Sequence, residues 1–461
     1  MEKEINSPVY KEVRDTPVRE ECDVLVVGGG AAGIMAALAA ARNGARTILV
    51  EKNTFPGGNM LGGVTGWRGL YNRSGPSGGK ALQLVRGIGE ELLERLRKSN
   101  GITAFYEELA ETTGETMGIH ADREILPLVV QDMLEDYGVK LYLRCMAVDT
   151  VMKGKSLCGI IMESKSGREA ILSEIIVDCT GDANVARYAG AVLTGQLSRR
   201  NGGMIFGLSH VDLLKARDYL NSRGLLAFLS YAAEEAGKER IARLGFRLED
   251  MREFDAYREK YHLHPTPCLV SSHENCADMV NGVTMEFNTL EEKEVTEACL
   301  ELNDCCFHMA ELFRELIPGF ENSYPDWTPP VLGLGFGRQV ACEYEIKTED
   351  IENGRTGEDA IGLCGVFNGH GMDSLVSGDG RFGIPYRALL PKGTENLLAA
   401  GRLLSCEAEV FSSLGTVGAC FIEGQAAGTA AALACQKQIS LGSLSVAELR
   451  EVLRRDGVFF G

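Results

Sequence analysis

One glycine-rich turn near the N-terminus constrains the fold more than any other feature of the chain. The apolar residues 22–27 predict a buried strand, and the sequence GGGAAG follows at positions 28–33. An alanine-rich segment to about Asn43 predicts a helix, and residues 47–50 predict a second strand that ends at Glu51. A Rossmann-type unit that binds a dinucleotide typically has this order of elements: a strand, a GxGxxG turn, a helix, a second strand and an acidic residue.

The residues of this turn each have a physical role in such a unit. Gly28 allows the tight turn, Gly30 lets backbone N–H groups approach a pyrophosphate, and Gly33 lets the helix pack closely on the strand. The helix N-terminus adds partial positive charge, which favours the pyrophosphate. Glu51 is placed to accept hydrogen bonds from a ribose.

Composition excludes several other classes of protein. The 461 residues carry 47 Lys and Arg against 65 Asp and Glu, a net charge of −18, which argues against nucleic acid and anionic membranes as partners. The polar N-terminus does not resemble a signal peptide, and the longest apolar run, 419–435, is too short and too interrupted to span a membrane. The 14 cysteines include no CxxC pair. We therefore expect a cytoplasmic protein whose thiols are reduced and pack in the core.

Three further segments carry a family resemblance. Residues 52–60, KNTFPGGNM, form a second glycine-rich turn directly after Glu51. The segments 175–182, IIVDCTGD, and 396–402, NLLAAGR, each lead from an apolar strand into a glycine turn, and a helix is predicted from about Val417. Together with the first turn, they resemble FAD-dependent oxidoreductases with a glutathione-reductase-type fold, in which the second turn runs along the flavin pyrophosphate and ribityl chain.

Within that group, residues 286–433 are similar to a bacterial subgroup of FAD-dependent oxidoreductases, which is distantly similar to fumarate reductase and succinate dehydrogenase flavoproteins. Matching segments are 318–321, 338–349 and 384–393. Residues 335–337 read GFG where relatives commonly have Arg-Glu-Ser, and Ala408 and Gly415 stand where relatives often have His and Arg. The resemblance therefore implies the fold but not the substrate.

The resemblance implies non-covalent FAD, because no histidine occurs in the second glycine-rich turn, where some fumarate-reductase relatives attach the flavin. The cofactor contacts expected from these motifs are Gly28, Gly30, Ala31, Ala32, Gly33, Glu51, Lys52, Gly57, Gly58, Asn59, Met60, Ala147, Thr180, Gly181, Asp182, Gly401, Arg402, Val417, Gly418 and Ala419.

The order of the motifs predicts an α/β fold, with a Rossmann-like FAD-binding domain and an inserted α+β substrate or cap domain. Residues 1–20 are a lead-in, 21–200 and 331–445 form the FAD-binding domain, 201–330 form the cap, and 446–461 form a C-terminal helix. Residues 81–98 and 123–137 predict amphipathic helices, 140–161 predict a hairpin, and 291–316 predict a long helix.

Four residues are candidates for catalysis. His370 lies in a glycine-rich loop and can serve as an acid or base, or it is a loop histidine bonded to backbone. Arg381 can clamp a substrate carboxylate or carbonyl, with a surface salt bridge as the alternative. Arg338 and Tyr344 lie in a segment similar to the family, and a structural role for Arg338 is equally compatible with the sequence. Trp67 and Arg68 are interpreted as packing under a loop, with the substrate side of the flavin as the alternative.

Five residues of types that commonly bind metals lie close together between positions 262 and 276. The pattern H-x-H-x3-C-x4-H-x2-C is chemically suitable for zinc, but its spacing matches no common structural site and two prolines stiffen it. We therefore expect no metal. The cluster consists of His262, His264, Cys268, His273 and Cys276.

The leading hypothesis is an FAD-dependent oxidoreductase that transfers a hydride between flavin N5 and a small organic substrate under the cap. Residues 333–337, GLGFG, lack the strand and acid of a second nucleotide-binding unit, so a small substrate or a separate electron carrier is expected in each half-reaction. The alternatives are a flavin electron-transfer subunit that works with a ferredoxin-like partner, and an FAD-containing protein without turnover. The sequence predicts no oligomeric state.

Overall fold

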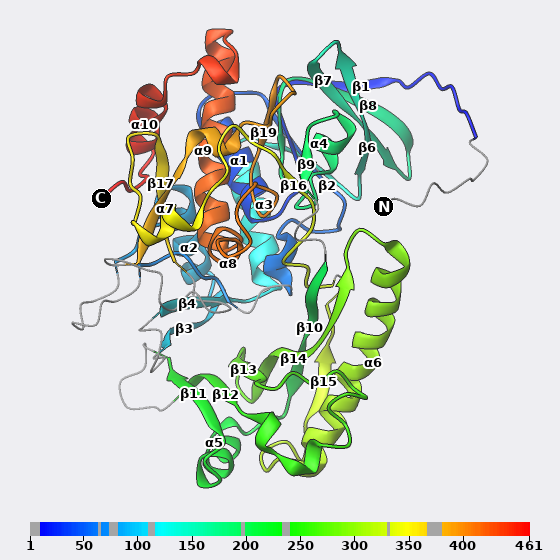
Figure 1. The fold of residues 1–461 in the computed structure, drawn as a ribbon, viewed down its shortest axis with the longest axis vertical. Coiled ribbons are helices and arrows are strands. Elements are labelled where there is room, and N and C mark those ends of the chain that lie inside the picture. The colour runs from blue at the N-terminus through cyan, green and yellow to red at the C-terminus, as the bar shows by residue number, and fades with distance from the viewer. Residues whose placement is uncertain are drawn as a thin grey trace.

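The computed structural model describes residues 10–62, 66–72, 82–108, 116–194, 199–232, 240–329, 332–366 and 380–461. These residues form two units, one built on a mostly parallel sheet and the other on an antiparallel sheet (Figure 1). The hairpin of β3 (Ile102–Glu108) and β4 (Thr116–Ala121) lies at the boundary between the units (Figure 1).

The sheet of the first unit has the strand order β5-β2-β1-β8-β7-β6, with β19 beside β8. Five of its strands run parallel, whereas β7 and β6 are antiparallel additions to the first half of β8. The carboxyl ends of parallel strands meet at one edge of a sheet, so the loops after them gather there. The strands are β1 (Val18–Val27), β2 (Thr47–Glu51), β5 (Lys140–Leu143), β6 (Met146–Lys153), β7 (Ser156–Ser164), β8 (Gly167–Asp178) and β19 (Leu397–Ala399).

Two small-residue helices, α1 (Ala31–Arg42) and α9 (Val417–Lys437), pack together against this sheet. Added Cβ atoms at Gly424 and Gly428 would lie 2.1 and 2.0 Å from backbone oxygens of α1. The glycines of α9 therefore allow the two backbones to approach closely. The other helices of this unit are α2 (Ile88–Lys98), α3 (Ile125–Asp136), α4 (Asn184–Tyr188), α7 (Thr348–Glu352), α8 (Phe411–Leu414) and α10 (Val446–Arg455).

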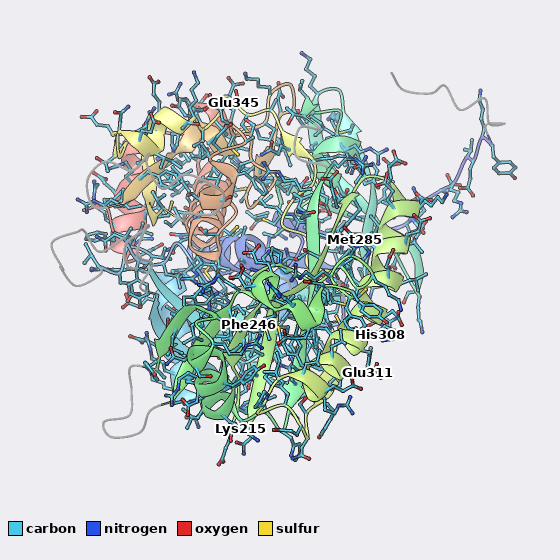
Figure 2. All side chains as sticks on the ribbon, turned by 60° about the horizontal axis from the view of Figure 1, so that its bottom comes forward. Lys215, Phe246, Met285, His308, Glu311 and Glu345 are labelled. Atoms are coloured by element: carbon cyan, nitrogen blue, oxygen red, sulfur yellow. The ribbon has the colours of Figure 1, made fainter. Side chains whose placement is uncertain are left out.

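The second unit is a six-stranded antiparallel sheet in the order β11-β12-β13-β14-β10-β15. Helix α6 (Glu292–Leu316) covers it, and Phe313 of α6 is in ring contact with Phe246, Phe254 and Phe320. Figure 2 looks at this unit and shows His308 and Glu311 of α6 at its outer edge. Its elements are β10 (Arg199–Ser209), α5 (Leu213–Ser222), β11 (Leu226–Tyr231), β12 (Ile241–Phe246), β13 (Cys268–Ser271), β14 (Cys276–Asn288) and β15 (Tyr324–Trp327).

Two short strand pairs complete the described structure. The first joins β9 (Leu193–Thr194) to β16 (Gln339–Val340), and the second joins β17 (Ala360–Gly365) to β18 (Arg381–Pro385). No helix in the described part of the chain is long and apolar enough to cross a membrane.

The structure confirms the predicted fold class and places the long helix of the second unit at 292–316, within one residue of the prediction. The helix predicted over 81–98 begins only at Ile88, because Leu84 and Val85 donate backbone hydrogen bonds to Leu70 instead. The hairpin predicted over 140–161 is also wrong in part. The chain turns at Arg144, whose φ is 57°, so β5 joins β2 in parallel and the hairpin consists of β6 and β7. The domain boundaries stay a prediction.

Candidate cofactor-binding site

A cavity of about 370 Å³ lies at the carboxyl edge of the parallel sheet. Its wall includes residues at the ends of three parallel strands: Val27 of β1, Val50 of β2 and Ala400, which follows β19. Helix α6 of the second unit contributes Val295 and Cys299. Most of the predicted cofactor contacts line it: Gly28, Gly30, Ala31, Ala32, Glu51, Lys52, Gly58, Asn59, Met60, Ala147, Thr180, Gly181, Asp182, Gly401, Arg402 and Val417.

The start of α1 fits a pyrophosphate. Gly30 is the N-cap of this helix and provides no side-chain cap, so the first N–H groups of α1 remain for a ligand. A Cβ atom at Gly30 would meet nothing within 4 Å, whereas one at Gly28, whose φ is +101°, would lie 2.3 Å from the Cys179 carbonyl oxygen. Gly28 is therefore required by the fold, and the open space at Gly30 is available to the cofactor.

The Glu51 carboxylate connects the two glycine-rich turns. Its side chain is buried, and it accepts hydrogen bonds from the N–H groups of Gly29 at 2.6 Å and Asn53 at 2.7 Å. Gly57 in turn donates its N–H to the Gly29 carbonyl at 2.7 Å. Each carboxylate oxygen still has acceptor capacity for a ribose hydroxyl.

The Thr-Gly-Asp turn after β8 is ordered by the buried Asp178. This carboxylate accepts hydrogen bonds from the N–H and the hydroxyl of Thr180 at 3.0 and 2.7 Å, and from the Ala186 N–H at 2.9 Å. Burial raises the pKa of Asp178, and these hydrogen bonds oppose the shift. The turn is thus held in place before any cofactor binds.

Arg402 joins three segments of the cavity wall. Its guanidinium donates to the Gly181 carbonyl at 2.9 Å, to the Leu334 carbonyl at 2.6 Å and to Asp182 Oδ1 at 3.0 Å. Asn59 donates to the same Leu334 carbonyl at 2.5 Å. Leu334 and Gly335 of the GLGFG segment therefore form part of the wall of this cavity.

Removing the Arg402 side chain should weaken FAD binding while leaving the chain folded. Hydrogen bonds to charged groups contribute about 1.5–3 kcal/mol each, so we expect Arg402→Ala to raise the Kd for FAD by roughly 10- to 100-fold. Flavin fluorescence on titration of the apoprotein measures this. Arg387→Ala, which removes an exposed partner of Asp359, is the control and should leave the Kd unchanged. Equal Kd values for the two variants would contradict the role of Arg402.

Four predicted contacts do not line the cavity. A Cβ atom at Gly33 would lie 1.8 Å from the Gly28 carbonyl oxygen, so Gly33 serves the packing of helix on turn. Gly57 packs on Leu61. The N–H groups of Gly418 and Ala419 are bonded to the Arg68 carbonyl and the Thr416 hydroxyl. At the start of α9, Val417 and Cys420 line the cavity instead.

Of the four predicted catalytic residues, Arg338, Tyr344 and Arg381 do not line the cavity. His370 lies outside the described residues. Arg338 is half-buried with Asn184 Oδ1 at 3.5 Å, and burial together with Arg187 lowers its pKa. Tyr344 donates to Asp350 at 2.8 Å, and burial beside this carboxylate raises its pKa. Arg381 lies on β18 opposite Gly365. The catalytic roles of these residues stay predictions.

The candidate zinc ligands are directed to different partners. His262 pairs with Glu301 at 2.8 Å, His273 pairs with Asp122 at 3.0 Å, and His264 Nδ1 accepts the Thr266 N–H. Among the described residues, no group of three or more His, Cys, Asp or Glu side chains is arranged to hold a metal ion.

A second, smaller cavity of about 20 Å³ lies between the two units. Sequence reasoning missed its polar residues, which come from different segments: His120 from β4, Arg123 from the turn before α3, and Asp278 from β14. The remaining wall is mainly apolar and includes Trp67 and Trp327. Met60 lines both cavities, so the two are neighbours. No local motif links His120 and Arg123 to Asp278, which lies 158 and 155 positions further along the chain.

The parallel sheet, the uncapped start of α1 and the acid at the end of β2 define a dinucleotide-binding protein of the Rossmann type. The second glycine-rich turn and the Thr-Gly-Asp turn add to the cavity beyond the part that a mononucleotide would occupy, and FAD, as a dinucleotide, needs this additional length. A family model described as FAD dependent oxidoreductase matches residues 23–453, and the chain belongs to that family. It is an enzyme whose cofactor is FAD.

Curated relatives match only part of the chain. Thiamine thiazole synthase from Methanococcus vannielii is 26% identical over 174 residues, 36% of this chain and 58% of that protein. Digeranylgeranylglycerophospholipid reductase 1 from Methanococcoides burtonii is 24% identical over 203 residues, 44% of this chain and 48% of that protein. The chain thus spans about half the length of these relatives. A solved p-nitrophenol 4-monooxygenase from Pseudomonas putida has 13% identity and a TM-score of 0.48, covering 95% of this chain and 86% of that chain.

Proposed function

We propose that this enzyme transfers a hydride between the N5 atom of its FAD and a small organic substrate that binds between the two units. The observation that carries the proposal is the position of the smaller cavity, which shares Met60 with the cofactor cavity and is lined by Ile205, Asp278 and Trp327 of the second unit. Domain boundaries of this kind are the usual location of small-molecule sites. FAD, when bound, supplies the reversible two-electron chemistry.

The residues of the chain would supply binding and proton transfer. The cofactor cavity has segments for the pyrophosphate at α1 and for the ribose at Glu51. The smaller cavity has room for one water-sized group, and it offers three ionisable side chains within an apolar wall to the polar end of a substrate. The curated relative from Methanococcoides burtonii is named as a reductase. A second, 4-oxocyclohex-2-ene-1-carboxylate 5-dehydrogenase from Sinomonas cyclohexanicum, is 36% identical over 91 residues. Both names are compatible with hydride transfer to or from a small organic molecule.

The two half-reactions can be tested separately on the purified holoprotein. Under anaerobic conditions, the protein is reduced photochemically and mixed with 2-cyclohexen-1-one, crotonate or a ferredoxin, and the return of the oxidised flavin band is followed. We expect an organic acceptor to restore the band. Restoration by ferredoxin alone would contradict hydride transfer to a small molecule and would favour the electron-transfer subunit. Prompt bleaching of the oxidised protein by NADH would identify nicotinamide as the donor.

A further inference from the structure

The smaller cavity contains a histidine paired with a buried carboxylate. His120 Nε2 lies 2.8 Å from Asp278 Oδ2, and the two side chains are 12% and 5% exposed. The same carboxylate accepts the indole N–H of Trp327 at 3.1 Å and has Arg123 Nη1 at 3.5 Å. Two donors from separate segments, Trp327 of β15 and Arg123 of the turn before α3, therefore hold Asp278, and Asp278 in turn fixes the imidazole ring of His120.

The opposite nitrogen of the same ring is available for chemistry. A carboxylate accepts hydrogen bonds, so its contact places the proton of the neutral imidazole on Nε2 and leaves a lone pair on Nδ1. In the described part of the chain, Nδ1 of His120 has no hydrogen-bond partner. A histidine oriented by a carboxylate through one nitrogen, with the other nitrogen free, is the arrangement of a general base.

The charged groups nearest His120 are Asp278 and Arg123, which also pair with each other. Asp278 and Arg123 cancel each other, so the neutral histidine leaves the cavity without net charge. Arg123 also lies over the Trp327 ring, 3.8 Å from its centroid, which holds the cation on one side of the carboxylate. A proton taken up at Nδ1 produces an imidazolium that Asp278 stabilises directly.

The size and lining of the cavity indicate what could contact Nδ1. A volume of about 20 Å³ holds one water molecule or a single oxygen atom of a ligand. The surrounding wall is apolar and consists mainly of Met60, Leu61, Trp67, Ile205 and Trp327. This environment suits a mostly apolar molecule that presents one oxygen to the histidine.

We propose that His120 is a catalytic acid–base residue, that Asp278 is its positioning residue, and that the substrate is a small, mostly apolar alcohol or ketone. The proposal rests on the proposed function. In the direction of oxidation, Nδ1 of His120 takes the hydroxyl proton while the carbon–oxygen double bond forms. The hydride from the same carbon goes to FAD, so the alcohol loses two electrons and becomes the ketone. In the reverse direction, Nδ1–H returns the proton to the oxygen.

Tryptophan fluorescence reports binding at this cavity without turnover, because the chain contains two tryptophans and both line it. The oxidised holoprotein is titrated with 2-cyclohexen-1-one, which quenches indole fluorescence. We expect saturable quenching in the wild type, and only linear collisional quenching in His120→Gln, which keeps the size of the side chain but not the base. His273→Gln is the control, since His273 also pairs with a carboxylate but does not line the cavity.

The outcomes separate this proposal from the proposed function. The proposed binding site is overturned if quenching in the wild type is only linear. It is also overturned if His120→Gln shows saturable quenching with the same affinity as the wild type. A third outcome is that the wild type binds the ketone saturably and His120→Gln does not, but the bound ketone fails to reoxidise the photoreduced flavin. That result would support the binding site and would overturn both hydride transfer and the catalytic role of His120.

When the ketone does reoxidise the flavin, we expect the rate in His120→Gln to be lower by roughly 100-fold or more. Asp278→Asn should lower the rate less and change its pH profile, while the visible flavin spectrum stays that of the wild type. A pH profile identical to the wild type would show that Asp278 is only structural and would overturn its positioning role.

Discussion

Replacing Gly30 with leucine is expected to give a folded protein that has lost its flavin. The backbone at Gly30 has φ −80° and ψ −168°, an extended conformation that any residue adopts, and a Cβ atom there meets nothing within 4 Å. The leucine side chain would therefore enter the cofactor cavity without disturbing the packing of the protein. Because α1 presents its free N–H groups at this point, the pyrophosphate would be excluded. We expect FAD binding to fall below detection.

The measurement is the ratio of flavin to protein absorbance after purification, together with the thermal unfolding of the apoprotein. Gly442→Leu is the matched control, because Gly442 is exposed, also has open space at its Cβ position, and lies far along the chain from the cavity. It should retain a full complement of FAD. If Gly30→Leu retains its flavin, the turn at Gly30 does not bind the FAD pyrophosphate. If the apoprotein of this variant is unfolded, the space beside Gly30 is needed for the packing of the protein and is not reserved for the cofactor.

Replacing Glu423 with glutamine is expected to stabilise the protein at alkaline pH. Glu423 lies on α9 and is fully buried, with the Gly401 N–H donated to Oε2 at 2.6 Å. Burial raises its pKa to about 8, and the Gly401 N–H opposes the shift only in part. Between the unfolded value of about 4.5 and the folded value, the folded state retains a proton that the unfolded state has released. The free energy of unfolding therefore falls as pH rises through this window.

The contribution of Glu423 to this fall is up to about 1.4 kcal/mol per pH unit. Glutamine is neutral at every pH, and its amide oxygen can still accept the Gly401 N–H. Chemical unfolding of Glu423→Gln and wild type from about pH 5 to about pH 9 should show a stability difference that grows in favour of the variant. The exposed Glu409→Gln controls for the removal of a charge. Parallel stability curves for Glu423→Gln and wild type would contradict a buried neutral carboxyl.

The cofactor site was predictable because its information is local. Each glycine-rich turn directly follows a strand, and a parallel sheet brings the ends of its strands to one edge. The same logic fails at the start of α9. Gly418 and Ala419 were expected to contact the cofactor, but the Gly418 N–H is bonded to the carbonyl of Arg68, hundreds of positions away, and such a bond leaves no pattern in the chain. The Ala419 N–H is bonded to the hydroxyl of Thr416, the N-cap of α9, which is a local feature that the sequence analysis did not use.

The sequence by itself thus determined the Rossmann unit, the FAD family and most of the cavity wall, since these depend on backbone conformation and on short spacings. Only the tertiary structure brought His120 to Asp278, which are 158 positions apart. The pair depends on how a hairpin of the first unit meets the second sheet, and this is decided by the packing of apolar faces. A buried polar pair across such an interface has no periodicity of its own, so the residues proposed for proton transfer could be found only in three dimensions.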